Sequence, residues 1–272
     1  MTKKVVCVSH WGPFSLHDKN AVVTGGAMGI GLGIVKRLSA AGANVLIADL
    51  DFDCAMTEAK ALETGGAKAA CLKLDVTAQD AGDQIVRAMV ENFGGVDILV
   101  NNAGIYPQVP MLNMEPALFD KVYQINLKAL AFISKAVGQK MVDQGKGGKI
   151  VNIASIDGLH PSMVGLAAYD ASKGGVVMFT KNFALEMGKY GVSVNAIAPG
   201  GISTPGTAAP LAGSGMTQEQ MDAMMAAFTA RIPMGRMGAP DDIGKVAAFL
   251  ASSASDYMTG EIVVVDGGML LS

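Results

Sequence analysis

Cysteine and histidine are scarce in this chain of 272 residues, which holds three of each. Cys7, Cys54 and Cys71 form no CxxC pair, and the few histidines cannot complete a recognisable set of zinc ligands. We therefore expect no bound metal. The odd, scattered set of cysteines also favours reduced thiols and a cytoplasmic location.

Long apolar runs and runs of basic residues are missing as well. No stretch reaches the length of a membrane span, and the apolar residues near Met1 are too few for a signal-peptide core. A formal net charge of -3 and a pI near 5.6 argue against nucleic acid or an anionic membrane as the partner. These absences favour a small molecule as the binding partner.

Half of the residues are hydrophobic, and short apolar runs alternate with longer helix-like segments from residue 20 onward. The strand-like runs are 21–24, 45–49, 69–74, 98–101, 150–153, 192–197 and 262–265. The helix-like segments are 30–41, 54–64, 78–93, 117–142 and 163–189. This alternation predicts a single α/β domain with a Rossmann-type, doubly wound parallel sheet of about seven strands and helices on both faces.

Two segments lie outside this alternation. Residues 1–15 precede the first strand, carry Trp11 and form an N-terminal extension to which the sequence assigns no role. Residues 204–237 form a long, methionine-rich excursion before the last strand. Long ordered excursions are often lids, so we expect a substrate lid here, with an ordinary amphipathic surface helix as an equal alternative. The domain itself is expected to span residues 16–272.

A glycine-rich stretch from Thr24 to Gly31 joins the first expected strand to the first helix. Its glycines permit a tight turn, so that a pyrophosphate can approach the unpaired N–H groups of the helix N-terminus. Asp49 ends the second strand, where a carboxylate can accept hydrogen bonds from a ribose and repels a 2′-phosphate. Because neither Met28 nor Leu50 adds a positive charge, the sequence favours NAD over NADP.

Tyr169 and Lys173 lie four residues apart, and Ser155 precedes the tyrosine by fourteen residues. Residues four apart share a helix face, so the Lys173 charge can lie beneath the Tyr169 oxygen. A free tyrosine has a pKa of about 10, and roughly 4 kcal/mol of preferential stabilisation of the phenolate brings it to about 7. We expect Lys173 and a cationic nicotinamide ring to supply that stabilisation.

With these pieces placed, the chain resembles the short-chain dehydrogenase/reductase family in its single-domain YxxxK form, from about residue 16 to the C-terminus. The resemblance rests on seven motifs that occur in the family's order. These are Thr24 to Gly31, Asp75-Val76, Asn101 to Gly104, Asn126, Ser155, Tyr169 with Lys173, and Pro199-Gly200 followed by Ile202 and Thr204.

The resemblance implies a role for each catalytic residue. Tyr169 would exchange a proton with the substrate alcohol, and Ser155 would position the substrate oxygen. Lys173 would lower the pKa of Tyr169 and bind the nicotinamide ribose, while Asn126 would hold a water that relays protons. The implied cofactor contacts are Thr24, Gly25, Met28, Gly29, Ile30, Gly31, Asp49, Leu50, Asp75, Val76, Asn102, Ala103, Gly104, Tyr169, Lys173, Pro199, Gly200, Ile202 and Thr204.

For the substrate we expect contacts from Ser155, Asp157, His160 and Tyr169. The interval from Ser155 to Tyr169 is one residue longer than the family pattern, which predicts a bulged loop at His160 and Pro161. A lone loop histidine is more often simply exposed than bound to substrate.

The leading interpretation is an NAD-dependent dehydrogenase that transfers a hydride between NAD(H) and a secondary alcohol or its ketone. Apolar residues expected near the site, namely Ile156, Leu159, Met163, Val164 and the methionines of the expected lid, favour a hydrophobic alicyclic, aryl-alkyl or steroid-like substrate. Polyols and sugars stay open. So does a 3-oxoacyl reductase, although such reductases usually take NADPH, which Asp49 opposes.

A protein that senses NAD without turnover is the alternative from a different class. The complete catalytic set argues against it, because a binding module does not need those four side chains. An enoyl reductase would space its tyrosine and lysine more widely. Family habit further implies a homo-oligomer, a tetramer or a dimer, that uses the long fifth and sixth helices and the C-terminal segment.

Overall fold

The seven apolar runs become seven strands in the computed structural model, which describes residues 12–205 and 217–272. They are β1 (Asn20–Thr24), β2 (Asn44–Asp49), β3 (Ala69–Lys73), β4 (Ile98–Asn101), β5 (Gly148–Ile153), β6 (Val192–Pro199) and β7 (Ile262–Val265). All of them pair in parallel, in the order β3-β2-β1-β4-β5-β6-β7. The predicted Rossmann-type sheet is thus confirmed, and the strand order reverses between β1 and β4.

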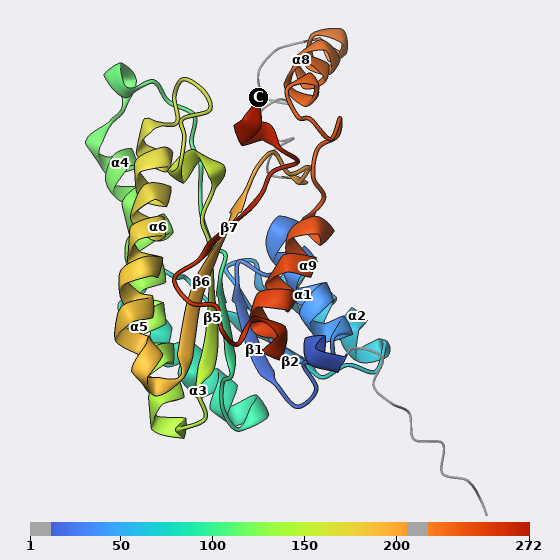
Figure 1. Ribbon diagram of the computed structural model, residues 1–272, viewed down its shortest axis with the longest axis vertical. Coiled ribbons are helices and arrows are strands. Elements are labelled where there is room, and N and C mark those ends of the chain that lie inside the picture. Colours follow the sequence, from blue (N-terminus) through green and yellow to red (C-terminus); the bar gives the residue numbers. More distant parts are fainter. Residues whose placement is uncertain (1–11, 206–216) are drawn as a thin grey trace, which may run out of the picture.

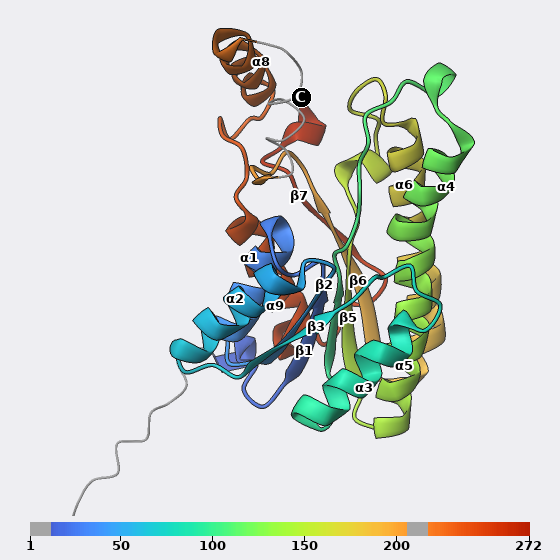
Figure 2. The same ribbon diagram turned by 180° about the vertical axis from the view of Figure 1, so that it is seen from behind.

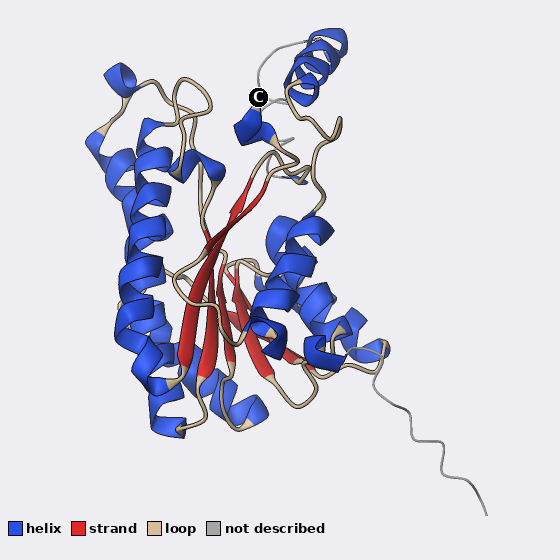
Figure 3. Cartoon of the chain, viewed as in Figure 1, coloured by secondary structure: helices blue, strands red, loops and turns tan. Residues whose placement is uncertain are grey.

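Helices cover both faces of this sheet, as the alternation predicts (Figure 3). One face carries α1 (Gly29–Ala40), α2 (Phe52–Thr64) and α9 (Pro240–Ala251). The opposite face carries α3 (Ala81–Phe93), α5 (Leu130–Gln144) and α6 (Ala167–Met187), as Figures 1 and 2 show from the two sides. None of the helices within the described ranges is long and apolar enough to cross a membrane.

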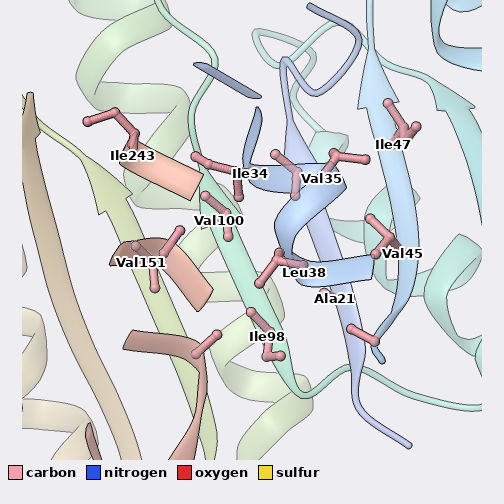
Figure 4. Packing of buried hydrophobic residues seen from close by; sticks show 14 of the residues in the cluster. Ala21, Ile34, Val35, Leu38, Val45, Ile47, Ile98, Val100, Val151 and Ile243 are labelled. Carbon is pink, nitrogen blue, oxygen red and sulfur yellow. The ribbon is translucent and has the colours of Figure 1, made fainter. Parts of the chain in front are cut away.

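The core is divided by the sheet because successive strand side chains point to opposite faces. In β1, Val23 packs in a cluster with Ile34 of α1, whereas its neighbour Val22 packs with Ile85 of α3. Figure 4 shows the first of these clusters, in which α1 contributes its buried face to the strands. Burial on both faces explains why the strand sequences are continuous apolar runs rather than alternating ones.

The expected helix over residues 117–142 is divided into three parts. It consists of α4 (Pro116–Tyr123), a π-helical segment at Gln124–Ala129, and α5. The wider π turn re-aims side chains within an otherwise continuous helix, and such turns often occur at functional sites. Residue 126, expected in the site, lies inside it.

Other helix boundaries differ from expectation for local reasons. Helix α6 begins at Ala167 rather than at residue 163, because Gly165 before it has a left-handed backbone with φ of +95°. Helix α2 begins two residues early, since the Asp51 side chain accepts a hydrogen bond from the Cys54 N–H and caps it.

The two exceptional segments are described only in part. Residues 1–11, with Trp11, lie outside the described residues; of the extension, the 3-10 turn Gly12–Phe14 places the Phe14 ring 6.3 Å from Phe249 of α9. Of the expected lid at 204–237, residues 206–216 also lie outside the described residues. Its described part contains α8 (Gln218–Ala230), which stands beyond the carboxyl ends of the strands (Figure 1).

Candidate active site

A cavity of about 520 Å³ lies at the carboxyl ends of the strands, around the reversal between β1 and β4. Ligands of doubly wound sheets bind in the crevice at this point. The predicted site residues that line it are Gly25, Met28, Gly29, Ile30, Gly31, Asp49, Leu50, Asp75, Val76, Asn102, Ala103, Gly104, Ser155, Asp157, Tyr169, Lys173, Pro199, Gly200, Ile202 and Thr204. Thr24, Asn126 and His160, which were also predicted, do not belong to its lining.

The glycine loop forms a cradle at the start of α1. Gly25 and Gly29 have φ of +60° and +56°, and a Cβ on Gly31 would overlap the carbonyl oxygen of Gly25. Met28, at the N-cap of α1, makes no side-chain cap hydrogen bond. The first N–H groups of the helix are therefore available to an anion, so this loop fits the pyrophosphate of a dinucleotide.

Thr24 supports this cradle from behind rather than lining it. Its buried Oγ1 accepts hydrogen bonds from the backbone N–H groups of Asn102 and Ala103, at 3.0 and 3.2 Å. The Asn102 amide in turn donates to the carbonyl oxygens of Thr24 and Gly25, at 3.0 and 2.8 Å. The ends of β1 and β4 are thus tied together beneath the glycine loop.

Asp49 lies in the cavity wall at the end of β2. One carboxylate oxygen accepts from the Ala27 N–H at 2.9 Å and the other from the Asp51 N–H at 3.0 Å. Asp49 therefore holds the glycine loop as well as presenting its carboxylate to the cavity. Its neighbour Leu50 is exposed and supplies no cation for a 2′-phosphate.

Asp75 and Val76 also line the cavity, at the turn after β3. The hydroxyl and N–H of Thr77 both donate to one oxygen of Asp75, and these hydrogen bonds lower the pKa of its carboxyl. The carboxylate is thereby fixed in one orientation at the turn after β3.

Lys173 reaches the cavity from α6 with only 4% of its surface exposed. Its Nζ donates to the carbonyl oxygen of Ile153 at 2.7 Å and lies 5.8 Å from the centre of the Tyr169 ring. Burial lowers the pKa of Lys173 to about 8. The spacing of four residues therefore does bring the two side chains onto one helix face.

Tyr169 has a raised pKa, which differs from the expectation drawn from that spacing. Burial is the largest cause; a hydrogen bond with Ser155 opposes it, and the charges of Asp157 and Asp170 add to the rise. Removal of water disfavours the charged phenolate, and this cost sets the direction of the shift. A lowered pKa in the complex with cofactor stays a prediction.

Asn126 is fully buried inside the π-helical segment and makes three hydrogen bonds. Its Oδ1 accepts from the Ile105 N–H and its Nδ2 donates to the Ile105 carbonyl, both at 2.8 Å. Nδ2 also donates to the Ser172 hydroxyl at 3.0 Å. The side chain therefore fixes the segment after β4. Gly104 lies between the Asn126 amide and the Lys173 ammonium. A Cβ on this glycine would lie 3.2 Å from Asn126 Oδ1 and 3.6 Å from Lys173 Nζ.

Ser155 and Asp157 are joined directly at the start of the turn Ile156–Gly158. The Ser155 hydroxyl donates to Asp157 Oδ2 and accepts from the Asp157 N–H, both at 3.1 Å. Asp157 Oδ1 is buried without a hydrogen-bond partner among the described residues. Nearby Asp170 has a pKa raised to about 6, by burial and by the charge of Asp157.

His160 and the four apolar candidates of the 156–164 loop do not line this cavity. His160 is exposed, with Nδ1 3.0 Å from the Pro161 carbonyl oxygen. Leu159, Met163 and Val164 are exposed outside the lining, and Ile156 is buried beneath it. Across residues 12–205 and 217–272, no group of three or more His, Cys, Asp or Glu side chains gathers as metal ligands.

Tyr106 lines the cavity from within residues 105–109, which the sequence places at the substrate site without giving this tyrosine a role of its own. Its ring meets that of Tyr169 edge-on at 6.1 Å, and its hydroxyl hydrogen-bonds to Thr204. It thus joins the segment after β4 to the segment after β6 across the cavity. The signal in the sequence is an aromatic residue two positions after the Asn-Asn-Ala-Gly turn, which ends at Gly104.

Comparison with known proteins gives consistent matches over nearly the whole chain. A family model described as enoyl-(acyl carrier protein) reductase matches residues 25–270. Galactitol 2-dehydrogenase of Agrobacterium fabrum is 39% identical over 269 residues, which cover 94% of this chain and 99% of that protein. Gluconate 5-dehydrogenase of Gluconobacter oxydans is 35% identical over 265 residues, which cover 97% of this chain and 100% of that protein.

A solved structure from Agrobacterium tumefaciens with bound NADP, described as a 2-deoxy-D-gluconate 3-dehydrogenase, has a TM-score of 0.84 and 37% identity. The match covers 96% of this chain and 99% of that one. The fold, the glycine cradle and the relatives define an oxidoreductase of the dinucleotide-binding class. Within that class, the chain belongs to the short-chain dehydrogenase/reductase family.

Proposed function

We propose that this protein oxidises a secondary alcohol, or reduces the corresponding ketone, with NAD(H) as the cofactor. One observation carries the proposal: a single cavity holds both the glycine cradle and the Ser155, Tyr169 and Lys173 side chains. A binding module that only senses NAD would not need the Ser155, Tyr169 and Lys173 side chains beside the glycine cradle.

Each of these side chains has a distinct task in the proposed reaction. Tyr169 exchanges the proton of the substrate hydroxyl, and Ser155 hydrogen-bonds the same oxygen and fixes its position. Lys173 lies close enough to stabilise the phenolate and reaches the space for a ribose. When bound, NAD supplies the hydride acceptor and a positive charge that favours the phenolate.

We propose that Asn126 takes part as a member of a proton relay between Lys173 and solvent. Its support is the gap at Gly104, which has no side chain between the Asn126 amide and the lysine ammonium. The π-helical turn holds the amide at this gap, and its bonds to Ile105 keep the cavity wall in place.

NAD is the proposed cofactor rather than NADP because the wall at the end of β2 is negative. Asp49 lines the cavity there, and the exposed side chain next to it is Leu50. The similar solved structure from Agrobacterium tumefaciens contains bound NADP, so the choice of NAD in this chain rests on its own residues. Like-charge repulsion by Asp49 is the support for NAD in this chain.

Two kinds of substrate body are candidates. The apolar residues of the 156–164 loop favour a hydrophobic alcohol from the sequence, but they do not line the described cavity. A polyol is favoured by Asp157, a carboxylate in the wall beside Ser155, and by the names of the relatives, which act on galactitol and gluconate. We therefore place a polyol ahead of a hydrophobic alcohol.

Reduction of 3-oxoacyl or enoyl groups is less favoured. A 3-oxoacyl reductase usually takes NADPH, which Asp49 opposes. The family model carries the name of an enoyl reductase, but in this chain the tyrosine and lysine are only four residues apart.

We further propose that the protein works in the cytoplasm as a homo-oligomer. Large apolar side chains are exposed on α5 and α6, namely Phe132, Met178 and Leu185, and such faces are commonly covered in assemblies. Light scattering measures the assembly directly, and a monomer at micromolar concentration would contradict this part of the proposal.

The test of the reaction is absorbance at 340 nm while the protein, NAD and a panel of secondary alcohols and polyols are mixed. We expect NADH to form with at least one alcohol. Tyr169→Phe should retain NAD binding and lose turnover by about a hundred-fold or more, because it removes the proton-exchanging group. No turnover by the parent on any alcohol, or equal turnover by the variant, would contradict the proposed function.

A further inference from the structure

Asp157 is a carboxylate in the active-site wall with one side-chain donor. Among the described residues, the Ser155 hydroxyl donates to its Oδ2 at 3.1 Å, and its buried Oδ1 has no partner. The N–H of Asp157 is directed back to the serine oxygen, also at 3.1 Å. The hydrogen-bonding state of this carboxylate therefore depends on where the Ser155 proton points.

Reduction of a ketone requires the Ser155 proton to point to the substrate rather than to Asp157. A carbonyl oxygen only accepts hydrogen bonds, so Ser155 and Tyr169 must both donate to it when they hold it for proton transfer. A hydroxyl has a single proton. Ser155 therefore turns away from Asp157 when a ketone binds, and the carboxylate loses its side-chain donor.

Asp157 is half-buried and its Oδ1 has no partner among the described residues, so the loss of its side-chain donor is unfavourable, and a substrate group in the cavity is placed to replace that hydrogen bond. We propose that the substrate carries a hydroxyl on the carbon next to the reacting carbon, and that this hydroxyl donates to Asp157. The pair of compounds is then a vicinal diol and its α-hydroxy ketone. This inference rests on the proposed function and specifies its substrate.

The geometry suits a neighbouring hydroxyl. Asp157 Oδ2 and the Ser155 hydroxyl are already in hydrogen-bond contact, and both residues line the cavity with Tyr169. Two oxygens on adjacent carbons can therefore meet Ser155 and Asp157 together. During oxidation the reacting C–H would give its hydride to NAD and the reacting O–H its proton to Tyr169, while the second hydroxyl would stay unchanged on Asp157.

Matched ketones test the inference on the unmodified protein. In 2-hydroxycyclohexanone and 2-methylcyclohexanone, a hydroxyl and a methyl group of similar size occupy the same position; 3-hydroxy-2-butanone and 3-methyl-2-butanone form the open-chain pair. With NADH, we expect kcat/KM for the hydroxyketone to exceed that for its methyl partner by about ten-fold or more in at least one pair.

Asp157→Asn tests the residue. Asparagine keeps the shape and one acceptor oxygen but removes the charge, so the preference for the hydroxyketone should fall by about ten-fold. Asp170→Asn is the matched control, because it removes a neighbouring charge from a residue outside the cavity lining and should leave that preference within about two-fold.

The outcomes separate this inference from the proposed function. If the parent turns over alcohols or ketones but shows no preference within either pair, or turns over neither hydroxyketone, the inference is wrong and the proposed function stands. The same holds if Asp157→Asn and Asp170→Asn change the preference equally. If the parent transfers no hydride to any ketone or from any alcohol, the proposed function itself fails.

Discussion

Asp170→Asn should make this protein more stable at neutral pH, because it removes a negative charge that the fold disfavours next to Tyr169. Asp170 lies on α6, and its Oδ1 is buried without a hydrogen-bond partner among the described residues. Burial, and then the charge of Asp157, raise its pKa from 3.8 to about 6. The folded state therefore resists ionisation of this carboxyl.

The direction and size follow from linkage. Between pH 3.8 and about 6 the folded state binds more protons at Asp170 than the unfolded state, so stability falls as the pH rises through this range. A shift of about two units corresponds to roughly 3 kcal/mol at pH 7. Because the side chain is partly exposed, we expect a gain of about 1–2 kcal/mol from the neutral variant.

Urea unfolding of the parent and the variant at pH 7.0 and pH 4.5 measures this effect. The gain in unfolding free energy should be largest at pH 7.0 and should shrink at pH 4.5, where the folded parent is already protonated at this site. A gain of equal size at both pH values, or a loss of stability at pH 7.0, would refute the reasoning from burial and charge.

Three further outcomes are expected. Asp49→Ala with Leu50→Arg should raise kcat/KM for NADP relative to NAD by about ten-fold or more, measured by absorbance at 340 nm. Leu50→Arg alone keeps Asp49 and its hydrogen bonds to the Ala27 and Asp51 N–H groups, so it should change this ratio less. Gly31→Ala should weaken NAD binding in calorimetry by about ten-fold or more because its Cβ overlaps backbone, whereas Gly188→Ala, with nothing within 4 Å, should leave binding unchanged. Lys173→Met should lower kcat and raise KM for NAD, yet raise the melting temperature at pH 7. Burial lowers the pKa of this lysine in the folded state from 10.5 to about 8, so the gain in melting temperature should shrink as the pH rises from about 8 to 10.5.

The sheet could be predicted because each strand is buried on both faces. Runs such as Val45 to Asp49 are apolar throughout their buried part, and such runs separated by helix-length segments leave few alternatives to a parallel sheet. Helix boundaries depend on finer features. The left-handed turn at Gly165 and the π turn at Asn126 arise from tertiary contacts that periodicity does not encode.

The positions of the site residues were predictable as motifs, but their partners were not. The spacing of Tyr169 and Lys173 placed them on one face, yet the pKa of the tyrosine depends on burial and on Asp157 and Asp170, which the fold brings near it. Likewise, the sequence names Ser155 but not the direction of its proton. That direction, toward Asp157, is what specifies the substrate proposed above.

Direct hydride transfer is the central claim, and isotope transfer tests it most directly. An alcohol that the protein oxidises would be deuterated at the reacting carbon, and the reduced cofactor would be isolated and examined by mass spectrometry. We expect one deuterium atom in each molecule of NADH formed by the parent, and about a hundred-fold less labelled NADH over the same time with Tyr169→Phe. NADH without deuterium, or the absence of NADH with every alcohol tested, would contradict the account.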